Sequence, residues 1–242
     1  MLARKQSLKA AEIALSTALV LAATIMVNVY VPATRGYFNL GETMIYLVAL
    51  LFNPFTAAFA GGVGSALADI ILGYTIYAPA TLVIKAVEGA VASALFRRLR
   101  VGGRVGGRAL LALSTGTVLA YSLLILIIGY TIFVGEVELT LSEFLRLRGF
   151  IDPVIWTFIA SALIATPIYV LVRKRGEIGL ILLSLLFAGS IMILGYYLYE
   201  QLILGYYALA EVPVNLGQVI LGIAVAIPTY MLVRRHIQRS AE

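Results

Sequence analysis

The sequence predicts an all-α protein that crosses a membrane several times. Of its 242 residues, 62% are hydrophobic and only 12% are charged, whereas soluble domains are about 45–50% apolar and about 25% charged. Apolar runs of about 20 residues, the length needed to span a bilayer, recur along the whole chain. No hydrophilic stretch between them is long enough for a separate globular domain. We therefore expect a single integral membrane domain over residues 1–242.

Breaks in the apolar runs predict where about eight membrane helices begin and end. Asn53-Pro54 separates the second helix from the third, because proline cannot continue a helix and disfavours helical geometry in the residue before it. Pro79 and Pro153 suit the first turn of a helix. The second helix is short, about 20 Å at about 1.5 Å per residue, so it need not cross the whole hydrocarbon layer. The expected helices are 10–31, 40–53, 55–73, 78–96, 108–134, 151–172, 178–204 and 214–234.

The basic residues predict the orientation of the chain. Fourteen of the 18 Lys and Arg residues fall in segments 4–9, 97–108, 173–175 and 234–239, which all lie on one side of the predicted membrane. The positive-inside rule places this side, and both termini with it, in the cytoplasm of a cell-membrane protein. Contact of the basic loops with anionic lipid or with a partner is the alternative interpretation.

Composition and motifs exclude several kinds of chemistry. Cysteine is absent, and the one histidine, His236, lies in the basic tail, so we expect no thiolate site and no histidine-centred metal or catalytic cluster. No phosphate-binding loop, nucleophile elbow or dinucleotide fingerprint occurs. We therefore expect no catalytic residue, no metal, no cofactor and no ATPase site in this chain.

Two segments share a helix-start pattern, Asn-Leu-Gly followed by Glu or Gln. They are Gly36-Tyr-Phe-Asn-Leu-Gly-Glu42 and Pro213-Val-Asn-Leu-Gly-Gln218. The pattern predicts that Asn39 and Asn215 cap helices and that Glu42 and Gln218 reach back to the first turn. Since helix N-termini carry partial positive charge, the same residues can also contact a ligand.

Ionisable residues inside a membrane helix each need a partner or a function, and four of them stand out in the predicted helices. They are Asp69, Lys85, Glu88 and Glu200. An Asp69–Lys85 or Lys85–Glu88 ion pair that locks two helices is one interpretation, and contact with a polar ligand is the other. Exchange of Lys85 for Ala or of Glu200 for Gln is expected to weaken ligand binding without loss of folding.

Tyrosines gather towards the predicted external side, among them Tyr37, Tyr196 and Tyr199. Tyrosines that line an external pocket could stack on a planar ligand. An interfacial aromatic belt is the alternative explanation, and a solvated helix end is the alternative for Glu200.

Small residues recur every fourth position in two predicted helices. In the third helix Gly61, Ser65, Asp69 and Gly73 follow this spacing, which favours close helix packing in lipid. In the first helix the row is Ala10, Ala14, Ala18 and Ala22. This alanine row either packs within the chain or forms a smooth surface for a different membrane subunit.

Taken together, these motifs resemble the substrate-binding S component of energy-coupling factor (ECF) vitamin transporters. The resemblance rests on the two helix-start segments, on Gly61-Gly-Val-Gly-Ser-Ala-Leu-Ala-Asp69, on Tyr77-Ala-Pro-Ala-Thr-Leu-Val-Ile-Lys-Ala-Val-Glu-Gly89 and on Gly195-Tyr-Tyr-Leu-Tyr-Glu200. It implies a six-helix core, residues 10–97 and 178–236, that binds a water-soluble vitamin or precursor from outside. The segment 109–172 would then be an inserted helical hairpin, which either faces lipid or meets another subunit.

The resemblance also implies site residues and partners. The loop at residues 31–40 would close over the ligand. Ala14, Ala18 and Ala22 would dock on a membrane coupling (T) subunit, and two cytoplasmic ATPase subunits would complete the complex. The expected substrate-binding residues are Tyr37, Asn39, Glu42, Asp69, Lys85, Glu88, Tyr196, Tyr199, Glu200, Asn215 and Gln218.

Three functions remain open on the sequence alone. The first is uptake of a vitamin by an ATP-driven complex, with a flavin- or pyrimidine-like ligand favoured by tyrosine, carboxylate and amide groups. The second is an autonomous ion-coupled secondary transporter of a small polar metabolite, in which Asp69, Lys85, Glu88 or Glu200 couples ion movement. The third, an intramembrane enzyme, has the weakest support.

Overall fold

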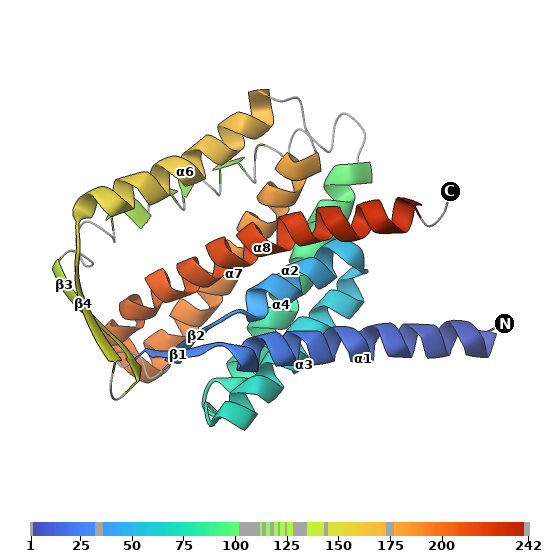
Figure 1. Ribbon diagram of the computed structural model, residues 1–242, viewed down its shortest axis with the longest axis horizontal. Helices are drawn as coiled ribbons and strands as arrows, with labels where there is room; N and C mark the ends of the chain where they lie inside the picture. Colours follow the sequence, from blue (N-terminus) through green and yellow to red (C-terminus); the bar gives the residue numbers. More distant parts are fainter. Residues whose placement is uncertain are drawn as a thin grey trace. The chain divides into compact units, whose positions relative to one another are not determined.

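The computed structural model describes residues 2–31, 36–101, 135–142, 145–172 and 177–239, together with scattered positions between 112 and 127. Its contacts divide the chain into two compact units (Figure 1). The first unit contains residues 1–97 and 184–242, and the second contains residues 98–183. The predicted division into a core and an inserted hairpin stays a prediction.

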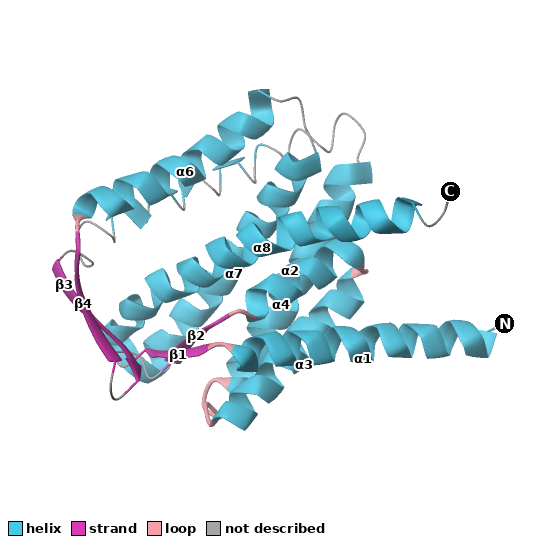
Figure 2. Ribbon diagram, in the orientation of Figure 1, coloured by secondary structure: helices cyan, strands magenta, loops and turns pink. Residues whose placement is uncertain are grey.

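The first unit is a helical bundle that carries one short β-hairpin (Figure 2). Its elements are α1 (Leu2–Met26), β1 (Asn28–Val31), β2 (Gly36–Asn39), α2 (Gly41–Leu51), α3 (Pro54–Leu72), α4 (Ala78–Val101), α7 (Glu177–Leu204), the 3₁₀ helix η1 (Gly205–Glu211) and α8 (Val212–Arg239). The C-terminal end of α4 and the N-terminal end of α7 belong to the second unit. That unit also holds the antiparallel strands β3 (Gly135–Ser142) and β4 (Leu145–Ile151), followed by α6 (Pro153–Val172).

The all-α, polytopic membrane fold predicted from the sequence is confirmed. Among the described residues, five helices are long and apolar enough to cross a membrane: α1, α3, α4, α7 and α8. The second helix is short, as expected, with 11 residues in α2. It packs against α1, α3 and α8 and buries residues on every face, including Ile45 and Tyr46. The predicted helix 108–134 falls largely outside the described residues.

Proline and its neighbours begin two helices as predicted. Asn53 is the N-cap of α3, and its side chain accepts hydrogen bonds from the backbone N–H groups of Phe55 (3.0 Å) and Thr56 (3.1 Å), with Pro54 in the first helical position. Asp152 Oδ1 accepts from the Val154 N–H at 2.8 Å in front of α6. These bonds satisfy N–H groups that a helix start leaves without a partner.

The chain after the first helix forms a β-hairpin, whereas the sequence predicted a helix up to residue 31 and a loop at residues 31–40. α1 ends at Met26, and residues 28–31 pair antiparallel with residues 36–39, so that Tyr30 lies opposite Tyr37. Valine and aromatic residues favour this extended geometry. The loop that follows the predicted fifth helix, which we expected on the external side, also contains a hairpin, β3–β4.

The two predicted helix caps have different outcomes. Asn39 Oδ1 accepts from the Gly41 N–H at 2.8 Å, although Leu40 occupies the N-cap position of α2. The prediction for Asn215 is wrong, because α8 begins at Val212 and Asn215 lies inside the helix. Proline at position 213 is tolerated there because the first helical N–H groups need no partner within the helix.

Small residues allow α3 to approach its neighbours closely, as the four-residue spacing predicts. A Cβ atom on Gly62 would lie 2.5 Å from the Leu82 carbonyl oxygen of α4, and one on Gly64 would lie 2.9 Å from the Thr17 carbonyl oxygen of α1. On α4, a Cβ on Gly89 would lie 2.5 Å from the Ala57 carbonyl oxygen. Larger side chains would push these backbones apart, so the glycines set the helix spacing.

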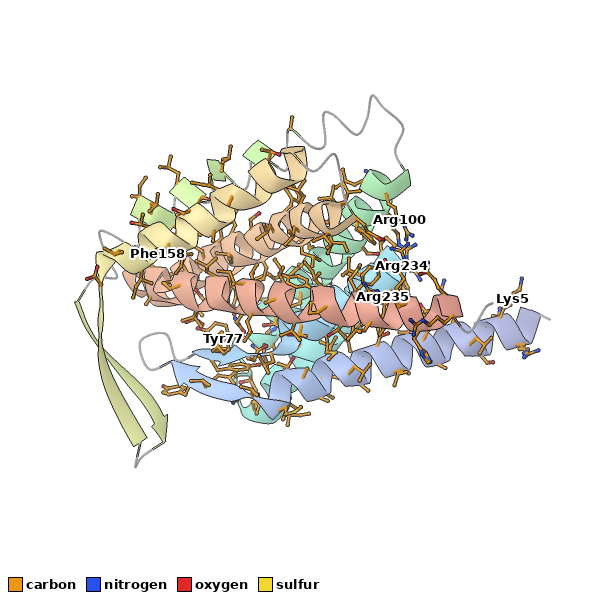
Figure 3. All side chains as sticks on the ribbon, turned by 45° about the horizontal axis from the view of Figure 1, so that its top comes forward. Lys5, Tyr77, Arg100, Phe158, Arg234 and Arg235 are labelled. Atoms are coloured by element: carbon orange, nitrogen blue, oxygen red, sulfur yellow. The ribbon has the colours of Figure 1, made fainter. Side chains whose placement is uncertain are left out.

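Basic residues of both termini lie at one end of the first unit. Figure 3 shows Lys5, Arg234 and Arg235 at this end and Tyr77 towards the opposite end. The predicted cytoplasmic residues Arg104, Arg108 and 173–175 lie outside the described residues, as does Arg35 of the predicted external side.

Candidate functional site

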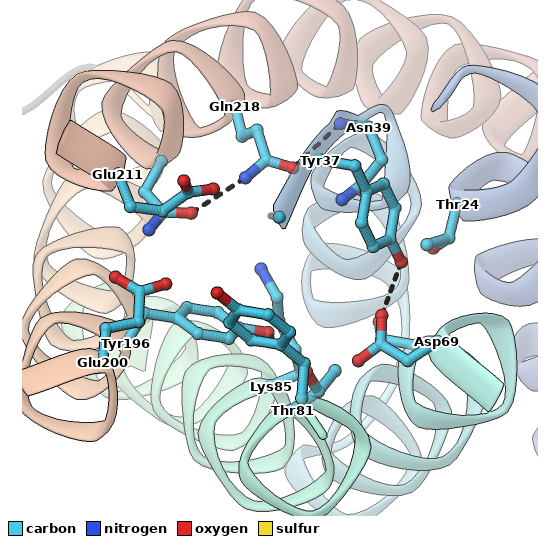
Figure 4. Close-up of a pocket in the computed structure, with 14 residues that line it drawn as sticks. Thr24, Tyr37, Asn39, Asp69, Thr81, Lys85, Tyr196, Glu200, Glu211 and Gln218 are labelled. Atoms are coloured by element: carbon cyan, nitrogen blue, oxygen red, sulfur yellow. Dashed lines mark hydrogen bonds between the residues drawn. The ribbon is translucent and has the colours of Figure 1, made fainter. Parts of the chain in front are cut away.

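A polar pocket lies inside the first unit, with walls from α1, β2, α3, α4, α7, η1 and α8 (Figure 4). Its volume is about 430 Å³, which includes open solvent at its mouth. Its lining consists of Thr24, Gly36, Tyr37, Asn39, Ser65, Asp69, Tyr77, Thr81, Lys85, Tyr196, Glu200, Glu211, Asn215 and Gln218. A concave site with a few convergent polar groups and aromatic side chains is typical of sites for small molecules.

Lys85 on α4 is the cation of the pocket lining, and two acids hold it. Its Nζ forms ion pairs with Glu42 of α2 and, at 3.5 Å, with Glu88 one turn further along α4. The Tyr46 hydroxyl donates to Glu88 Oε1 at 2.8 Å. Lys85, Glu42 and Glu88 are each at most 4% exposed. Burial of these charges is tolerated because each has an opposite charge beside it.

Asp69 bonds to Tyr37 rather than to Lys85, the partner considered from the sequence. Among the described residues, the ion pairs of Lys85 are with Glu42 and Glu88, while Asp69 Oδ1 accepts a hydrogen bond of 2.6 Å from the Tyr37 hydroxyl. Burial raises the pKa of Tyr37 well above its ordinary value, and the Asp69 charge adds to this shift. Tyr37 therefore stays protonated and remains a donor at any physiological pH.

The β1–β2 hairpin is fastened on two sides of the pocket. On one side Tyr37 bonds Asp69 of α3 and stacks on Tyr74, with ring centroids 4.3 Å apart. On the other side the Asn39 N–H donates to Gln218 Oε1 of α8 at 3.0 Å. Gln218 Nε2 in turn donates to Asn215 Oδ1 at 2.9 Å, which fixes the orientation of the amide (Figure 4).

Tyrosines form another wall of the pocket. The Tyr196 hydroxyl donates to Thr81 Oγ1 at 2.9 Å, and its ring lies 5.3 Å from Lys85 Nζ. Tyr77 packs beside Tyr199 with ring centroids 6.3 Å apart, and the Tyr199 hydroxyl donates to the Ile76 carbonyl. Burial raises the pKa of Tyr77, and the charges of Glu200 and Glu211 raise it further. These rings offer flat apolar surface next to carboxyl groups.

The structure brings eight of the eleven expected binding residues together. They are Tyr37, Asn39, Asp69, Lys85, Tyr196, Glu200, Asn215 and Gln218. Glu42 and Glu88 lie behind Lys85 rather than in the lining, and Tyr199 lies behind Tyr77. Whether the eight residues bind a substrate stays a prediction.

Sequence reasoning did not select six lining residues: Thr24, Gly36, Ser65, Tyr77, Thr81 and Glu211. Helical spacing contained a signal for two of them, because Ser65 lies four residues before Asp69 and Thr81 four residues before Lys85, each on the same helix face. Glu211 is an ionisable residue between two apolar segments, which is also a signal. No comparable signal in the sequence points to Thr24 or Gly36.

The three alanines predicted to dock on a partner are exposed on α1. Ala14, Ala18 and Ala22 all face away from the bundle, while Ser16, Val20 and Thr24 are buried. Leu15 (64% exposed) and Leu19 (43% exposed) flank the row. The alternative interpretation, that the alanine row packs within the chain, is therefore wrong for the first unit.

In the first unit, apolar helices surround a polar pocket. Within the described residues, no group of three or more His, Cys, Asp or Glu side chains could hold a metal ion. The model of the ECF-type riboflavin transporter S component family matches residues 5–145. The chain belongs to this family, and its apolar helices are those of a multi-pass membrane protein.

A relative is known from Pyrococcus woesei, where it is described as an uncharacterized protein in gap 3'region. It is 56% identical to this chain over 68 residues, which are 28% of this chain and 45% of the relative. The chain thus matches less than half the length of this curated relative.

Proposed function

We propose that the chain is the substrate-specific subunit of an ATP-driven ECF transporter and captures a water-soluble vitamin or vitamin precursor from outside the cell. The pocket is the observation that carries this proposal. It gathers phenolic, amide, hydroxyl and carboxyl groups from separate helices at a depth where unpaired polarity is costly. Such a set of groups suits recognition of one polar molecule better than helix packing alone.

The ligand in this proposal is a flat heterocycle of the flavin or pyrimidine kind. Tyr77 and Tyr196 supply ring surface for stacking, and Thr81, Asn215 and Gln218 supply hydrogen-bonding groups. The family whose model matches the chain is named for riboflavin, which supports a ligand of this kind.

Release and capture would involve the β1–β2 hairpin, which contains most of the loop predicted to close over the ligand. Its bonds to Asp69 and Gln218 join opposite walls of the pocket. Opening would break one hydrogen bond to each wall, so the hairpin can move without unfolding a helix. We assign Tyr37 and Asn39 to this closure, in addition to ligand contact.

Transport would depend on partners in the membrane and the cytoplasm. The exposed row Ala14, Ala18 and Ala22 provides a smooth helix face on which another helix can pack closely. We propose that a membrane coupling (T) subunit docks there and that two cytoplasmic ATPase subunits supply the energy. The basic ends of α1 and α8 support a cytoplasmic position of both termini under the positive-inside rule. Residues 10–97 and 178–236 would form the binding core, with 109–172 inserted into it.

Native mass spectrometry of the gently purified chain tests the proposal, because a tight binder retains its ligand. We expect a retained flavin or pyrimidine compound, which the chain together with its T and ATPase subunits then takes up into proteoliposomes only when ATP is present. Uptake by the chain alone that requires a proton or sodium gradient would instead establish the ion-coupled secondary transporter.

A further inference from the structure

The charges of the pocket are unequal in sign. Its lining contains three acids, Asp69, Glu200 and Glu211, and one base, Lys85. Glu42 and Glu88 already pair with that base. Among the described lining residues, an anionic ligand would therefore find no uncommitted positive side chain, and it would meet three carboxyl groups.

Glu200 and Glu211 form an acidic corner of the pocket. Figure 4 shows both carboxyl groups on the same side, away from the Tyr37–Asp69 pair. Glu200 is 1% exposed and Glu211 is 4% exposed. Glu200 Oε2 is buried and has no hydrogen-bond partner in the part of the chain that the structure describes. A buried oxygen of this kind destabilises the protein unless a donor reaches it.

Helix positions make Glu200 the less compensated of the two acids. Glu211 directly precedes α8, where the positive end of the helix dipole stabilises a carboxylate. Glu200 lies near the C-terminal end of α7, where the dipole gives no such help. A ligand that enters the pocket can supply the hydrogen-bond donor or the positive charge that Glu200 lacks.

Aromatic surface lies next to the acidic corner. The charges of both acids act on the Tyr77 hydroxyl, and Tyr77 packs against Tyr199. Tyrosine faces attract cations, above all planar ones from which water has been removed. A cluster that combines carboxyl groups with tyrosine rings is suited to an organic cation.

We propose that the ligand places a positively charged or protonated nitrogen group of a planar ring at Glu200 and Glu211, and that the pocket rejects anionic ligands, including phosphorylated forms of the same compound. This inference rests on the proposed function and specifies the charge of its substrate. A metal ion is a poorer occupant, because no group of three potential ligands is present in the described part of the chain.

Three probes with the same ring and different charges test the proposal: 1-methylnicotinamide (cation), nicotinamide (neutral) and nicotinate (anion). Each is titrated against the washed, detergent-solubilised full chain, and the melting temperature is followed to obtain an apparent Kd. We expect the cation to bind at least about tenfold more tightly than the anion, a difference of about 1.4 kcal/mol. Equal affinities, a preference for the anion, or no shift with any probe would overturn the proposal.

Glu200→Gln keeps the size of the side chain and removes its charge, so it should reduce the cation preference at least fivefold. Glu211→Gln provides a second test if the first variant does not fold. Glu177→Gln, on the same helix but away from the pocket lining, is the matched control and should keep the preference. A preference that survives both pocket exchanges would also refute the assignment.

The outcome separates this inference from the proposed function. If the chain retains and transports a vitamin but binds the three probes alike, the charge assignment fails and the transport function stands. If the cation preference is present but the assembled complex takes up no vitamin, the transport function fails and the acidic site stands.

Discussion

Lys85 serves first to neutralise buried acids. It lies between Glu42 and Glu88, both almost completely buried. Without it, two carboxyl groups would remain in a poorly solvated interior with no counter-charge. The structure thus changes the expectation that loss of Lys85 affects only ligand binding, because the fold depends on the same ammonium group.

Exchange of Lys85 for Met should lower the stability of the protein markedly. Removal of one partner from a buried ion pair costs about 3–5 kcal/mol, and methionine keeps most of the side-chain volume. Thermal unfolding in detergent should show a much lower midpoint. Addition of Glu42→Gln and Glu88→Gln to the same chain should recover part of the loss, because the uncompensated charges are then gone. An unchanged midpoint for the single variant would contradict this role.

Tyr37→Phe should accelerate ligand release while the fold remains intact. The exchange deletes the 2.6 Å hydrogen bond to Asp69 but keeps the ring that stacks on Tyr74. A hydrogen bond to a charged group contributes about 1.5–3 kcal/mol, so a dissociation rate about tenfold or more higher is expected. The rate is measured by displacement of the retained ligand. Tyr30→Phe is the control, since Tyr30 lies opposite Tyr37 in the hairpin and is 49% exposed. Equal ligand dissociation rates in the two variants would argue against a role of the Tyr37–Asp69 hydrogen bond in holding the hairpin closed.

At the level of the helices, glycines let the backbone of α3 approach α1 and α4 closely. Gly62→Ala should therefore destabilise the bundle by about 1–3 kcal/mol, because the new methyl group would meet the Leu82 carbonyl oxygen at 2.5 Å. Gly217→Ala on α8 is the matched control. The nearest atom to its new methyl group is Phe38 Cε2 at 3.4 Å, and alanine favours a helix over glycine by about 1 kcal/mol. The two variants should thus shift the melting temperature in opposite directions, and a shared direction would refute this account.

Sequence patterns predicted those features of the helices that neighbouring residues determine. Asn53-Pro54 gave the start of α3 within one residue, and the four-residue spacing of small residues predicted its close packing. The β1–β2 hairpin was missed, since residues 28–31 continue an apolar run and reveal their strand partner only in three dimensions. The Asn215 cap failed for a related reason: Val212 and Pro213 extend α8 backwards, beyond the capping pattern.

The pocket shows the same limit. An ionisable side chain in an apolar membrane helix is energetically unfavourable, so its presence indicates a functional site. This signal selected Asp69, Lys85 and Glu200. It could not identify their partners, because Glu42 reaches Lys85 and Tyr37 reaches Asp69 across long stretches of sequence. Partner choice depends on tertiary packing, which composition and periodicity do not contain.

At the scale of the whole molecule, the alanine face of α1 and the pocket are separate surfaces. Ala14 and Ala18 are exposed, whereas Thr24 on the buried face of the same helix lines the pocket. We therefore expect that the proposed ligand capture and the proposed docking on a coupling subunit can be altered independently. α1 contributes to both, and it packs against α2 and α3.

The double exchange Ala14→Trp and Ala18→Trp should abolish ATP-driven uptake but leave ligand affinity unchanged. Two indole rings on adjacent turns would hold a partner helix away from α1, whose small residues allow close approach. Uptake is measured in proteoliposomes that contain the T and ATPase subunits, and affinity is measured by calorimetry on the chain alone with the retained ligand. Ala224→Trp, at an exposed position of α8, is the control for the general effect of a large side chain on an apolar face. Since this control leaves α1 unaltered, it should transport at the normal rate. Normal uptake by the double variant would move the docking surface away from α1, and a parallel loss of affinity would indicate that α1 carries the ligand site and the docking site as one unit.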